Sequence, residues 1–239
     1  YQNLMGNIYL TGIDNVILKK KIGKNKFQIR TDNLPLLAFK NNLIFSDDSG
    51  SIFNISKSGK INWKKNIYKK IYKRVNKILV LSIYKKNIYV ADNIGFIYSI
   101  DSLNGKLLWI KNYGIPIKSN IKVFDNKIFL IDQDNQIICL NTKDGSKIWS
   151  IFSVSSFIKS QHLMSLALSK KGNLIAVNSS ADLFKINVDK GSIDWTINVS
   201  GSLYAEASDF FKSSDVVITN EEIIFSTISS VFSYNLNKG

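Results

Sequence analysis

The chain has 239 residues, of which 45% are hydrophobic and 12% aromatic, and its 32 Lys and Arg against 18 Asp and Glu give a formal net charge of +14. This apolar share is typical of a folded protein and excludes a disordered chain, and no apolar run is long enough to cross a bilayer. The single cysteine, Cys139, excludes an internal disulfide.

Pairs of short apolar strands recur along the chain, joined by turns of Asp, Asn, Ser and Gly. Such turn residues between β-rich runs predict a β-hairpin for each pair. The first strands are expected at residues 42–45, 87–90, 127–130, 173–176 and 222–225. The second strands are expected at residues 52–55, 97–100, 137–140, 183–186 and 231–234.

A further strand with a Gly-x-x-x-Trp phrase follows each of the first four hairpins. The glycines and tryptophans are Gly59 and Trp63, Gly105 and Trp109, Gly145 and Trp149, and Gly191 and Trp195. The tryptophans are 46, 40 and 46 residues apart, and such a period with a Gly/Trp signature is typical of a stack or ring of repeated units. Leu18, 45 residues before Trp63, takes the Trp position in a degenerate copy.

Each repeat also has a short apolar strand before its hairpin, for example at residues 122–124. The repeat therefore holds four antiparallel strands, which is the size of a β-propeller blade. We predict an all-β fold, a β-propeller of four-stranded antiparallel blades, with a β-sandwich of accidental Trp spacing as the alternative. The incomplete repeats at both ends favour a fragment of a larger protein. A single domain is expected over 1–239, with the tail of a blade at 1–23, complete blades at 35–68, 78–114, 120–153 and 163–199, and the start of a further blade at 212–239.

The positive charge has a compositional interpretation. Lys, Asn and Ile dominate the whole chain, as AT-rich coding would produce, and lysines occur in nearly every turn. The most basic stretch, residues 64–74, interleaves Lys and Arg with tyrosines, a pattern able to bind phosphate and stack bases. We favour a solvated strand and loop here over an anionic partner such as lipid headgroups or an acidic protein face, and we expect no nucleic acid partner.

The sequence offers little support for catalysis. His162 is the only histidine, and a Ser-His-Asp triad built on it would lack a Gly-x-Ser-x-Gly elbow, so we interpret it as a loop residue. Four turn acids do not follow the calcium-loop pattern, and a hairpin turn explains them without a metal. These acids are Asp47, Asp48, Asp132 and Asp134. We predict no catalytic residue, no metal and no cofactor.

The phrase at residues 99–109, which contains Asp101, Gly105 and Trp109, resembles the tryptophan-docking motif of quinoprotein-type propellers, Ala-x-Asp-x-x-Thr-Gly-x-x-x-Trp. Residues 139–149 and 185–195 are weaker copies with Asn in the Asp position, and the copy at 54–63 is one residue short. The resemblance implies that each Trp packs against the neighbouring blade.

Within this repeat family, the chain is most similar to the small, cofactor-free BamB-like outer-membrane assembly lipoproteins. The similarity lies in short degenerate blades and in the absence of catalytic residues. It implies a non-catalytic, monomeric protein-binding scaffold at the periplasmic face of the outer membrane. Such a scaffold would be held by an N-terminal lipid outside this chain and would bind the barrel-assembly protein. Members of this class have eight blades, which implies a larger ring.

Two other functions stay open at this point. A quinone-dependent oxidoreductase would need its adjacent-cysteine disulfide and calcium ligands outside this chain, and an extracytoplasmic sensor domain would need a transmembrane segment. For the scaffold, the candidate contact loops are the longer connections, because extra loop length often marks function. These connections are residues 68–77, 153–164 and 200–214.

If the tryptophans tie neighbouring blades together, their removal should destabilise the fold. Trp109→Ala or Trp149→Ala is expected to cost roughly 3–5 kcal/mol, because a large apolar area and one N–H partner are lost. A thermal melt measures the effect, and an unchanged melting temperature for both variants would contradict the assignment.

Overall fold

The computed structural model describes residues 36–153, 162–199, 213–219, 221–227 and 230–238. The secondary structure of the described residues consists of β-strands and one short 3-10 helix, η1 (Lys70–Arg74). The contacts divide the described residues into two compact units, unit 1 up to Gly114 and unit 2 from Ile115 onward. No helix among the described residues has the length and apolar character needed to cross a membrane.

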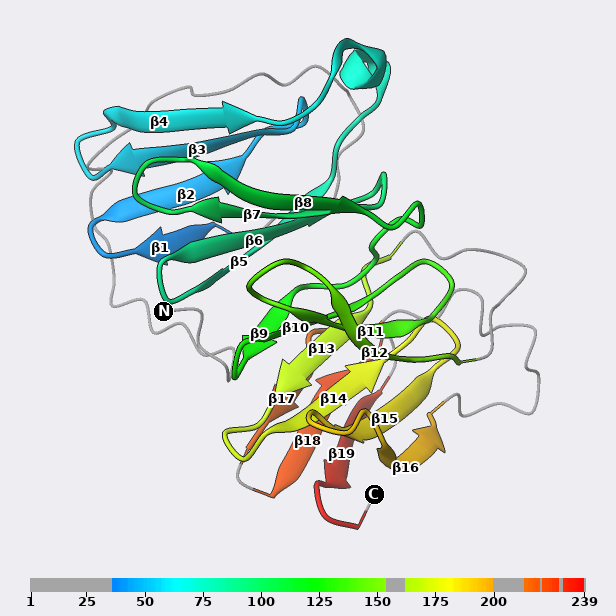
Figure 1. The fold of residues 1–239 in the computed structure, drawn as a ribbon. Coiled ribbons are helices and arrows are strands. Elements are labelled where there is room, and N and C mark those ends of the chain that lie inside the picture. Colours follow the sequence, from blue (N-terminus) through cyan, green and yellow to red (C-terminus); the bar gives the residue numbers. More distant parts are fainter. Residues whose placement is uncertain (1–35, 154–161, 200–212, 220, 228–229, 239) are drawn as a thin grey trace. The chain divides into compact units, whose positions relative to one another are not determined.

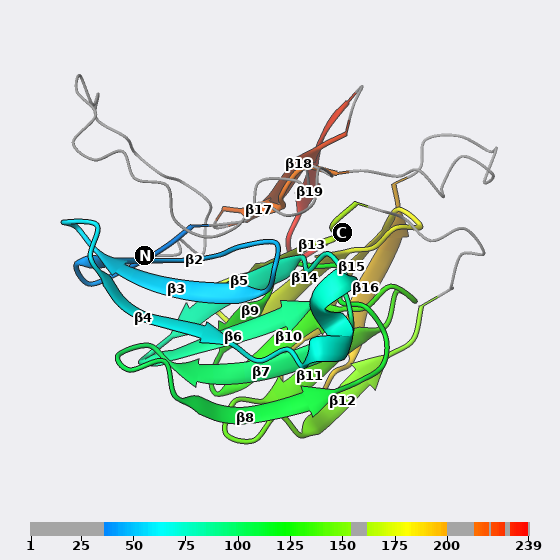
Figure 2. The same ribbon diagram turned by 90° about the horizontal axis from the view of Figure 1, so that it is seen from above.

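Unit 1 contains two four-stranded antiparallel sheets, in each of which every strand pairs with the next along the chain (Figure 1). Strands β1 and β5 contact each other, so the first strands of the two sheets are neighbours. Helix η1 lies in the connection between β4 and β5 (Figure 2). The strands are β1 (Leu37–Phe39), β2 (Asn42–Ser46), β3 (Ser51–Ser56), β4 (Ile61–Asn66), β5 (Leu79–Tyr84), β6 (Asn87–Asp92), β7 (Phe96–Asp101) and β8 (Leu107–Asn112).

Unit 2 repeats this arrangement with two four-stranded sheets and one three-stranded sheet. Its first strands are again neighbours, since β13 contacts both β9 and β17. The strands are β9 (Lys122–Phe124), β10 (Lys127–Ile131), β11 (Ile137–Asn141), β12 (Lys147–Ile151), β13 (Ser165–Leu168), β14 (Asn173–Val177), β15 (Asp182–Asn187), β16 (Ile193–Asn198), β17 (Val217–Ile218), β18 (Glu222–Ser226) and β19 (Val231–Asn235).

The predicted hairpins are confirmed. They are the pairs β2 and β3, β6 and β7, β10 and β11, β14 and β15, and β18 and β19. The Trp phrases end in β4, β8, β12 and β16, the fourth strand of each complete sheet. The expected single domain over 1–239 and its blade limits stay predictions, and the tail at 1–23 lies outside the described residues.

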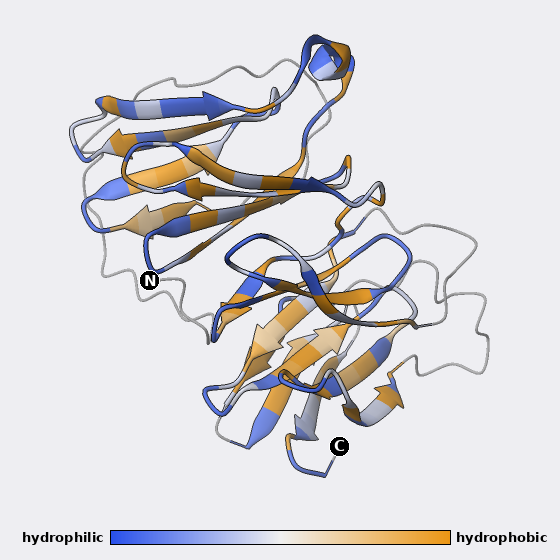
Figure 3. Ribbon diagram, viewed as in Figure 1, coloured by the Kyte–Doolittle hydropathy of each residue, from blue (hydrophilic) through white to orange (hydrophobic). Residues whose placement is uncertain are grey.

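Burial decreases from the inner strands of each sheet to the fourth strand. Strand β6 is buried from Ile88 to Asp92, on both faces of the sheet, whereas β8 and β16 have mostly exposed residues. Figure 3 shows hydrophobic residues concentrated in strands such as β14 and hydrophilic residues in the turns. In unit 1, Ile44 and Ile52 of one sheet join Leu81 and Val90 of the next in a single apolar cluster. The core therefore lies between neighbouring sheets.

A bulge accompanies each tryptophan. The pairing register of the third and fourth strands shifts directly after the residue opposite the Trp in all four complete sheets. The residues opposite the tryptophans are Asn54, Ser99, Cys139 and Lys185. Because a bulge bends its strand and re-aims side chains, this repeated irregularity belongs to the way the Trp is placed.

Candidate functional site

The turn between β7 and β8 is built around Asp101. Its Oδ1 accepts hydrogen bonds from the N–H of Leu103 at 2.8 Å and of Asn104 at 3.3 Å. The N–H of Gly105 donates to the backbone oxygen of Asp101 at 2.9 Å. Gly105 has a φ of +72°, a conformation that glycine adopts without steric cost. The Asp and Gly of the predicted motif thus form one hydrogen-bonded turn.

Asparagines build the same turn in unit 2. The Oδ1 atoms of Asn141, Asn187 and Asn235 accept the N–H two residues further on, at 2.9, 3.0 and 2.9 Å. An amide oxygen has the same reach as a carboxylate oxygen, so Asn replaces Asp here. In the copy that is one residue short, the N–H of Gly59 instead bonds the backbone oxygen of Ser56, three residues back.

Trp63 lies on the turn of the next sheet in unit 1. Its Nε1–H donates to the backbone oxygen of Ser102 at 3.0 Å, and the Nδ2 of Asn54 donates to the same oxygen at 3.0 Å. A Cβ atom at Gly105 would lie 2.8 Å from Cδ2 of the Trp63 ring. The absence of a side chain at this glycine is therefore what lets the ring approach.

Trp149 repeats the contact in unit 2. Its Nε1–H donates to the backbone oxygen of Val188 at 3.1 Å, and a Cβ at Gly191 would lie 2.6 Å from Cδ2 of its ring. In both units the acceptor is 39 residues after the Trp and three residues before the glycine. The predicted motif residues of neighbouring sheets are thus brought together, while their part in stability stays a prediction.

The remaining motif residues are placed as follows. Trp109 packs beside Tyr89 with ring centroids 6.3 Å apart. Trp195 packs against an apolar cluster that contains Leu236, and its buried Nε1–H has no hydrogen-bond partner among the described residues. The N–H of Gly145 donates to the backbone oxygen of its turn's Asn at 2.9 Å. Gly239, at the glycine position of the corresponding turn after Trp195, lies outside the described residues.

A second family of turns joins the second and third strand of each complete sheet. Asp47, Asp92, Asp132 and Asn178 begin these turns, and each Oδ1 accepts backbone N–H groups of its own turn at 2.8–3.0 Å. The spacings are 45, 40 and 46 residues, which follow the period of the tryptophans. Our sequence reasoning missed Asp92 and Asn178, and extending the repeat alignment into the turns would have found them.

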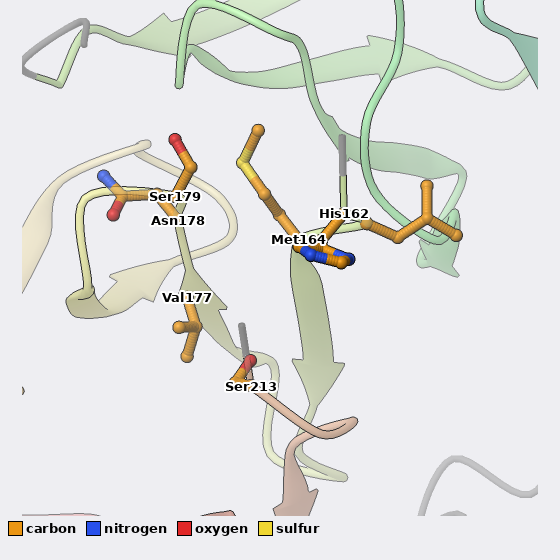
Figure 4. Close-up of a pocket in the computed structure, with 7 residues that line it drawn as sticks. His162, Met164, Val177, Asn178, Ser179 and Ser213 are labelled. Atoms are coloured by element: carbon orange, nitrogen blue, oxygen red, sulfur yellow. The ribbon is translucent and has the colours of Figure 1, made fainter. Parts of the chain in front are cut away.

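His162 borders a small pocket in unit 2, together with Met164, Val177, Ser179 and other residues (Figure 4). The pocket has a volume of about 10 Å³, about the size of one water molecule and far below that of a substrate site. The hydroxyl of Ser179 donates to Oδ1 of Asn135 at 2.8 Å. His162 lies outside the strands, as expected of a loop residue.

Of the three candidate contact loops, the structure describes residues 68–77 in full. Residues 154–161 and 200–212, the main parts of the other two, lie outside the described residues. The rings of Tyr68, Tyr72 and Phe96 meet edge to face, with centroids 5.6–6.2 Å apart. Lys77 is only 2% exposed; its Nζ lies 5.3 Å from the centroid of Tyr68 and donates to the backbone oxygen of Tyr72. The loop is therefore anchored from inside.

A buried carboxylate completes this anchor. The hydroxyl of Tyr68 donates to Oδ2 of Asp92, which is fully buried. Burial raises the pKa of Asp92 above its ordinary value, while the hydrogen bonds from Tyr68 and from the turn N–H groups oppose this rise. Burial also raises the pKa of Tyr68 and of the neighbouring Tyr98, so both phenols stay protonated.

Two open pockets flank the loop. One of about 160 Å³ is mainly apolar, and one of about 410 Å³ is polar and basic. The first is lined by Ile67, Tyr68, Lys69, Tyr72, Phe96 and Ile110, and the second by Ser49, Ser51, Lys64, Asn66, Tyr68, Lys73 and Lys77. Neither brings together the acid, base and nucleophile of a catalytic site.

Residues 48–239 match the family model described as outer membrane protein assembly factor BamB. The chain belongs to the BamB family. BamB of Moranella endobia is 26% identical over 173 residues, which cover 69% of this chain and 42% of that protein. BamB of Shewanella oneidensis is 25% identical over 146 residues, covering 52% of this chain and 35% of that protein. The matched part thus spans less than half the length of these relatives.

Solved structures confirm the predicted β-propeller fold. BamB from Moraxella catarrhalis superimposes with a TM-score of 0.71 at 13% identity, over 88% of this chain and 63% of that one. Quinohemoprotein alcohol dehydrogenase from Comamonas testosteroni superimposes with a TM-score of 0.67 at 12% identity, over 88% of this chain and 42% of that one. A europium-containing methanol dehydrogenase superimposes with a TM-score of 0.66 at 10% identity, over 85% of this chain and 49% of that one. At these identities the likeness shows the fold alone.

Because those dehydrogenases share the fold, a quinone or metal site has to be judged from the donor residues of this chain. Asp47, Asp92 and Asp132 each bind the N–H groups of their own turns. Among the described residues, no three His, Cys, Asp or Glu side chains gather as metal ligands. Burial raises the pKa of the Cys139 thiol to about 12, which makes it unreactive. The described residues do not fit a calcium-bound quinone, whose oxygen ligands must converge.

The contact between Trp149 and Gly191 can be tested against a matched glycine. Gly191 and Gly114 have φ values of +67° and +74°, and a Cβ at Gly114 would meet nothing within 4 Å. Gly114→Ala should therefore cost about 1 kcal/mol from the backbone alone, whereas Gly191→Ala should cost about 3 kcal/mol, because the Trp ring has to move. Urea unfolding compares the two variants, and equal costs would contradict the close packing.

The buried Asp92 predicts a pH dependence of stability. Because burial raises its folded-state pKa, wild-type stability falls as pH rises from the ordinary titration range of an aspartate toward neutral. Asp92→Asn keeps an oxygen for the turn N–H groups and removes the charge. The unfolding free energy of this variant should therefore rise relative to that of wild type as pH rises.

Tyr68→Phe is the opposite control. The hydrogen bond from the Tyr68 hydroxyl lowers the pKa of Asp92, so the loss of that hydroxyl should raise this pKa further. This variant should lose stability more steeply than wild type over the same pH range. Denaturant unfolding at a series of pH values measures both slopes, and parallel curves for all three proteins would defeat the assignment.

Proposed function

We propose that this chain is part of a non-catalytic protein-binding scaffold that acts in the assembly of β-barrel proteins, at the periplasmic face of the outer membrane. The observation that carries the proposal is the match of residues 48–239 to the assembly-factor family. The architecture supports it, because the described Asp and Asn side chains that recur with the repeat are used to build turns. The proposed partner is the barrel-assembly protein, bound by one copy of the scaffold that is anchored by an N-terminal lipid.

The outer strands offer a surface for such a partner. Each complete sheet ends in a Trp strand whose second edge pairs with no other strand among the described residues. These strands carry exposed aliphatic side chains, each 40–45% exposed. The side chains are Ile61, Leu108, Ile110, Ile148 and Ile193. An unpaired edge with apolar side chains suits the addition of a strand from another protein.

The proposal is tested by affinity capture of the tagged chain from its native envelope fraction, with partners identified by mass spectrometry. The barrel-assembly protein should be retained through a high-salt wash, since an apolar strand contact is little affected by salt. Leu108→Lys and Ile148→Lys place a charge on the outer strands and should reduce this capture. Leu103→Lys, in the exposed turn after β7, is the matched control and should not.

Capture of salt-sensitive anionic proteins alone, or equal capture by all three variants, would contradict the proposal. A visible absorption band after addition of pyrroloquinoline quinone and calcium would favour the oxidoreductase instead. The two measurements are independent, because the first reads protein contacts and the second reads a bound chromophore.

A further inference from the structure

The positive charge of the chain is confined to part of it. Residues 36–114 contain 14 Lys and Arg against four Asp and no Glu, whereas residues 115–238 contain 12 of each sign. Unit 1 is therefore strongly basic and unit 2 is neutral. AT-rich coding explains abundant lysine in both units, but it does not explain why the acids that balance lysine in unit 2 are missing from unit 1. Such asymmetry points to an anionic partner of unit 1.

Three of the four carboxylates in the described part of unit 1 are occupied by its own backbone. Asp47, Asp92 and Asp101 each accept N–H groups of the turns that they begin. In unit 2, Lys127 pairs with Asp125 and Asp189, and Lys185 pairs with Asp194. The turns of unit 1 thus use three of its four acids, which leaves few carboxylates to pair with its exposed cations.

Five of these cations lie in the 68–77 loop or in the strand before it and form what we call the basic patch: Lys64, Lys69, Lys70, Lys73 and Arg74. All five are exposed, and none is paired with a carboxylate within the described part of the chain. Lys64 and Lys73 line the same polar pocket, so strand β4 and helix η1 present their charges to one region.

An aliphatic side chain protrudes from the basic patch. Helix η1 has no buried residue, and Ile71, between Lys70 and the other cations of the helix, is 80% exposed. The hydrogen bonds that Tyr68 and Lys77 donate hold the loop in this shape, so the patch is ordered before it meets a partner. Cations around a protruding apolar side chain suit a bilayer interface, where acyl chains surround the apolar group and headgroups meet the cations.

We propose that the basic patch binds the surface of a bilayer that contains anionic phospholipid, with Ile71 inserted among the lipids. Nucleic acid fits less well, because the rings of Tyr68 and Tyr72 pack against Phe96 and are not presented for base stacking. An acidic protein face would match the charge but would need a pocket for a protruding Ile71. The inference goes beyond the proposed function and does not depend on it, since lipid binding is measured with this chain alone.

Co-sedimentation with vesicles tests the proposal. The chain should bind vesicles of phosphatidylcholine and phosphatidylglycerol at a ratio of about two to one, and bind pure phosphatidylcholine at least about tenfold more weakly. Reversing four charges of the patch, with Lys69→Glu, Lys70→Glu, Lys73→Glu and Arg74→Glu, should reduce binding to the mixed vesicles by at least about a hundredfold. Ile71→Ser should reduce it by about tenfold without changing the charge.

The matched control reverses four exposed lysines of unit 2, with Lys143→Glu, Lys147→Glu, Lys170→Glu and Lys171→Glu. It has the same net charge as the patch variant and should retain most of the binding. Equal losses in the two variants, or no binding of the wild-type chain to the mixed vesicles, would overturn the proposal. Patch-dependent binding to polyglutamate but not to the vesicles would also overturn it and would assign the patch to an acidic polypeptide.

Discussion

The contact between a tryptophan and the turn of the following sheet is the interaction that links neighbouring sheets in both units. The Nε1–H of Trp63 and of Trp149 each reach a backbone oxygen three residues before a glycine, and the ring occupies the space that a side chain there would fill. Burying an indole requires a partner for its N–H, and the Asp- or Asn-anchored turn supplies one in a fixed place. The Trp, the glycine and the turn-forming acid or amide therefore take part in one contact, although 39 residues separate the Trp from the residue whose backbone oxygen accepts its N–H.

Much of this fold could be predicted because its signals are local. Apolar runs and Asp, Asn, Ser and Gly turns place the hairpins, and the Gly-x-x-x-Trp phrase places the fourth strand. The bulge opposite each Trp could not be predicted, because it depends on the register between two strands and leaves no consistent residue in the sequence: the positions concerned are occupied by Asn54, Ser99, Cys139 and Lys185.

The candidate site was less accessible to sequence reasoning than the fold. Residues 68–77 stand out as a long basic loop, but their anchoring depends on Asp92 and Phe96, whose proximity only the tertiary structure provides. The uneven charge was present in the sequence and was overlooked, because lysines recur in nearly every repeat. It becomes visible when acids are counted separately for each compact unit. Conversely, two of the turn acids that suggest a metal in isolation, Asp47 and Asp132, are explained by N–H groups within four residues of them.

The direction of the Trp contact also bears on how such a protein changes over evolution. In each unit one repeat supplies a tryptophan to the glycine turn of the repeat that follows, so the two interfaces of this type in the described part of the chain are of one kind. An in-frame deletion or duplication of one whole period joins a tryptophan to an equivalent turn, wherever in the period the break falls. Genes of this type can therefore gain or lose repeats without first evolving a new interface, which separates the number of blades from the chemistry that holds them together.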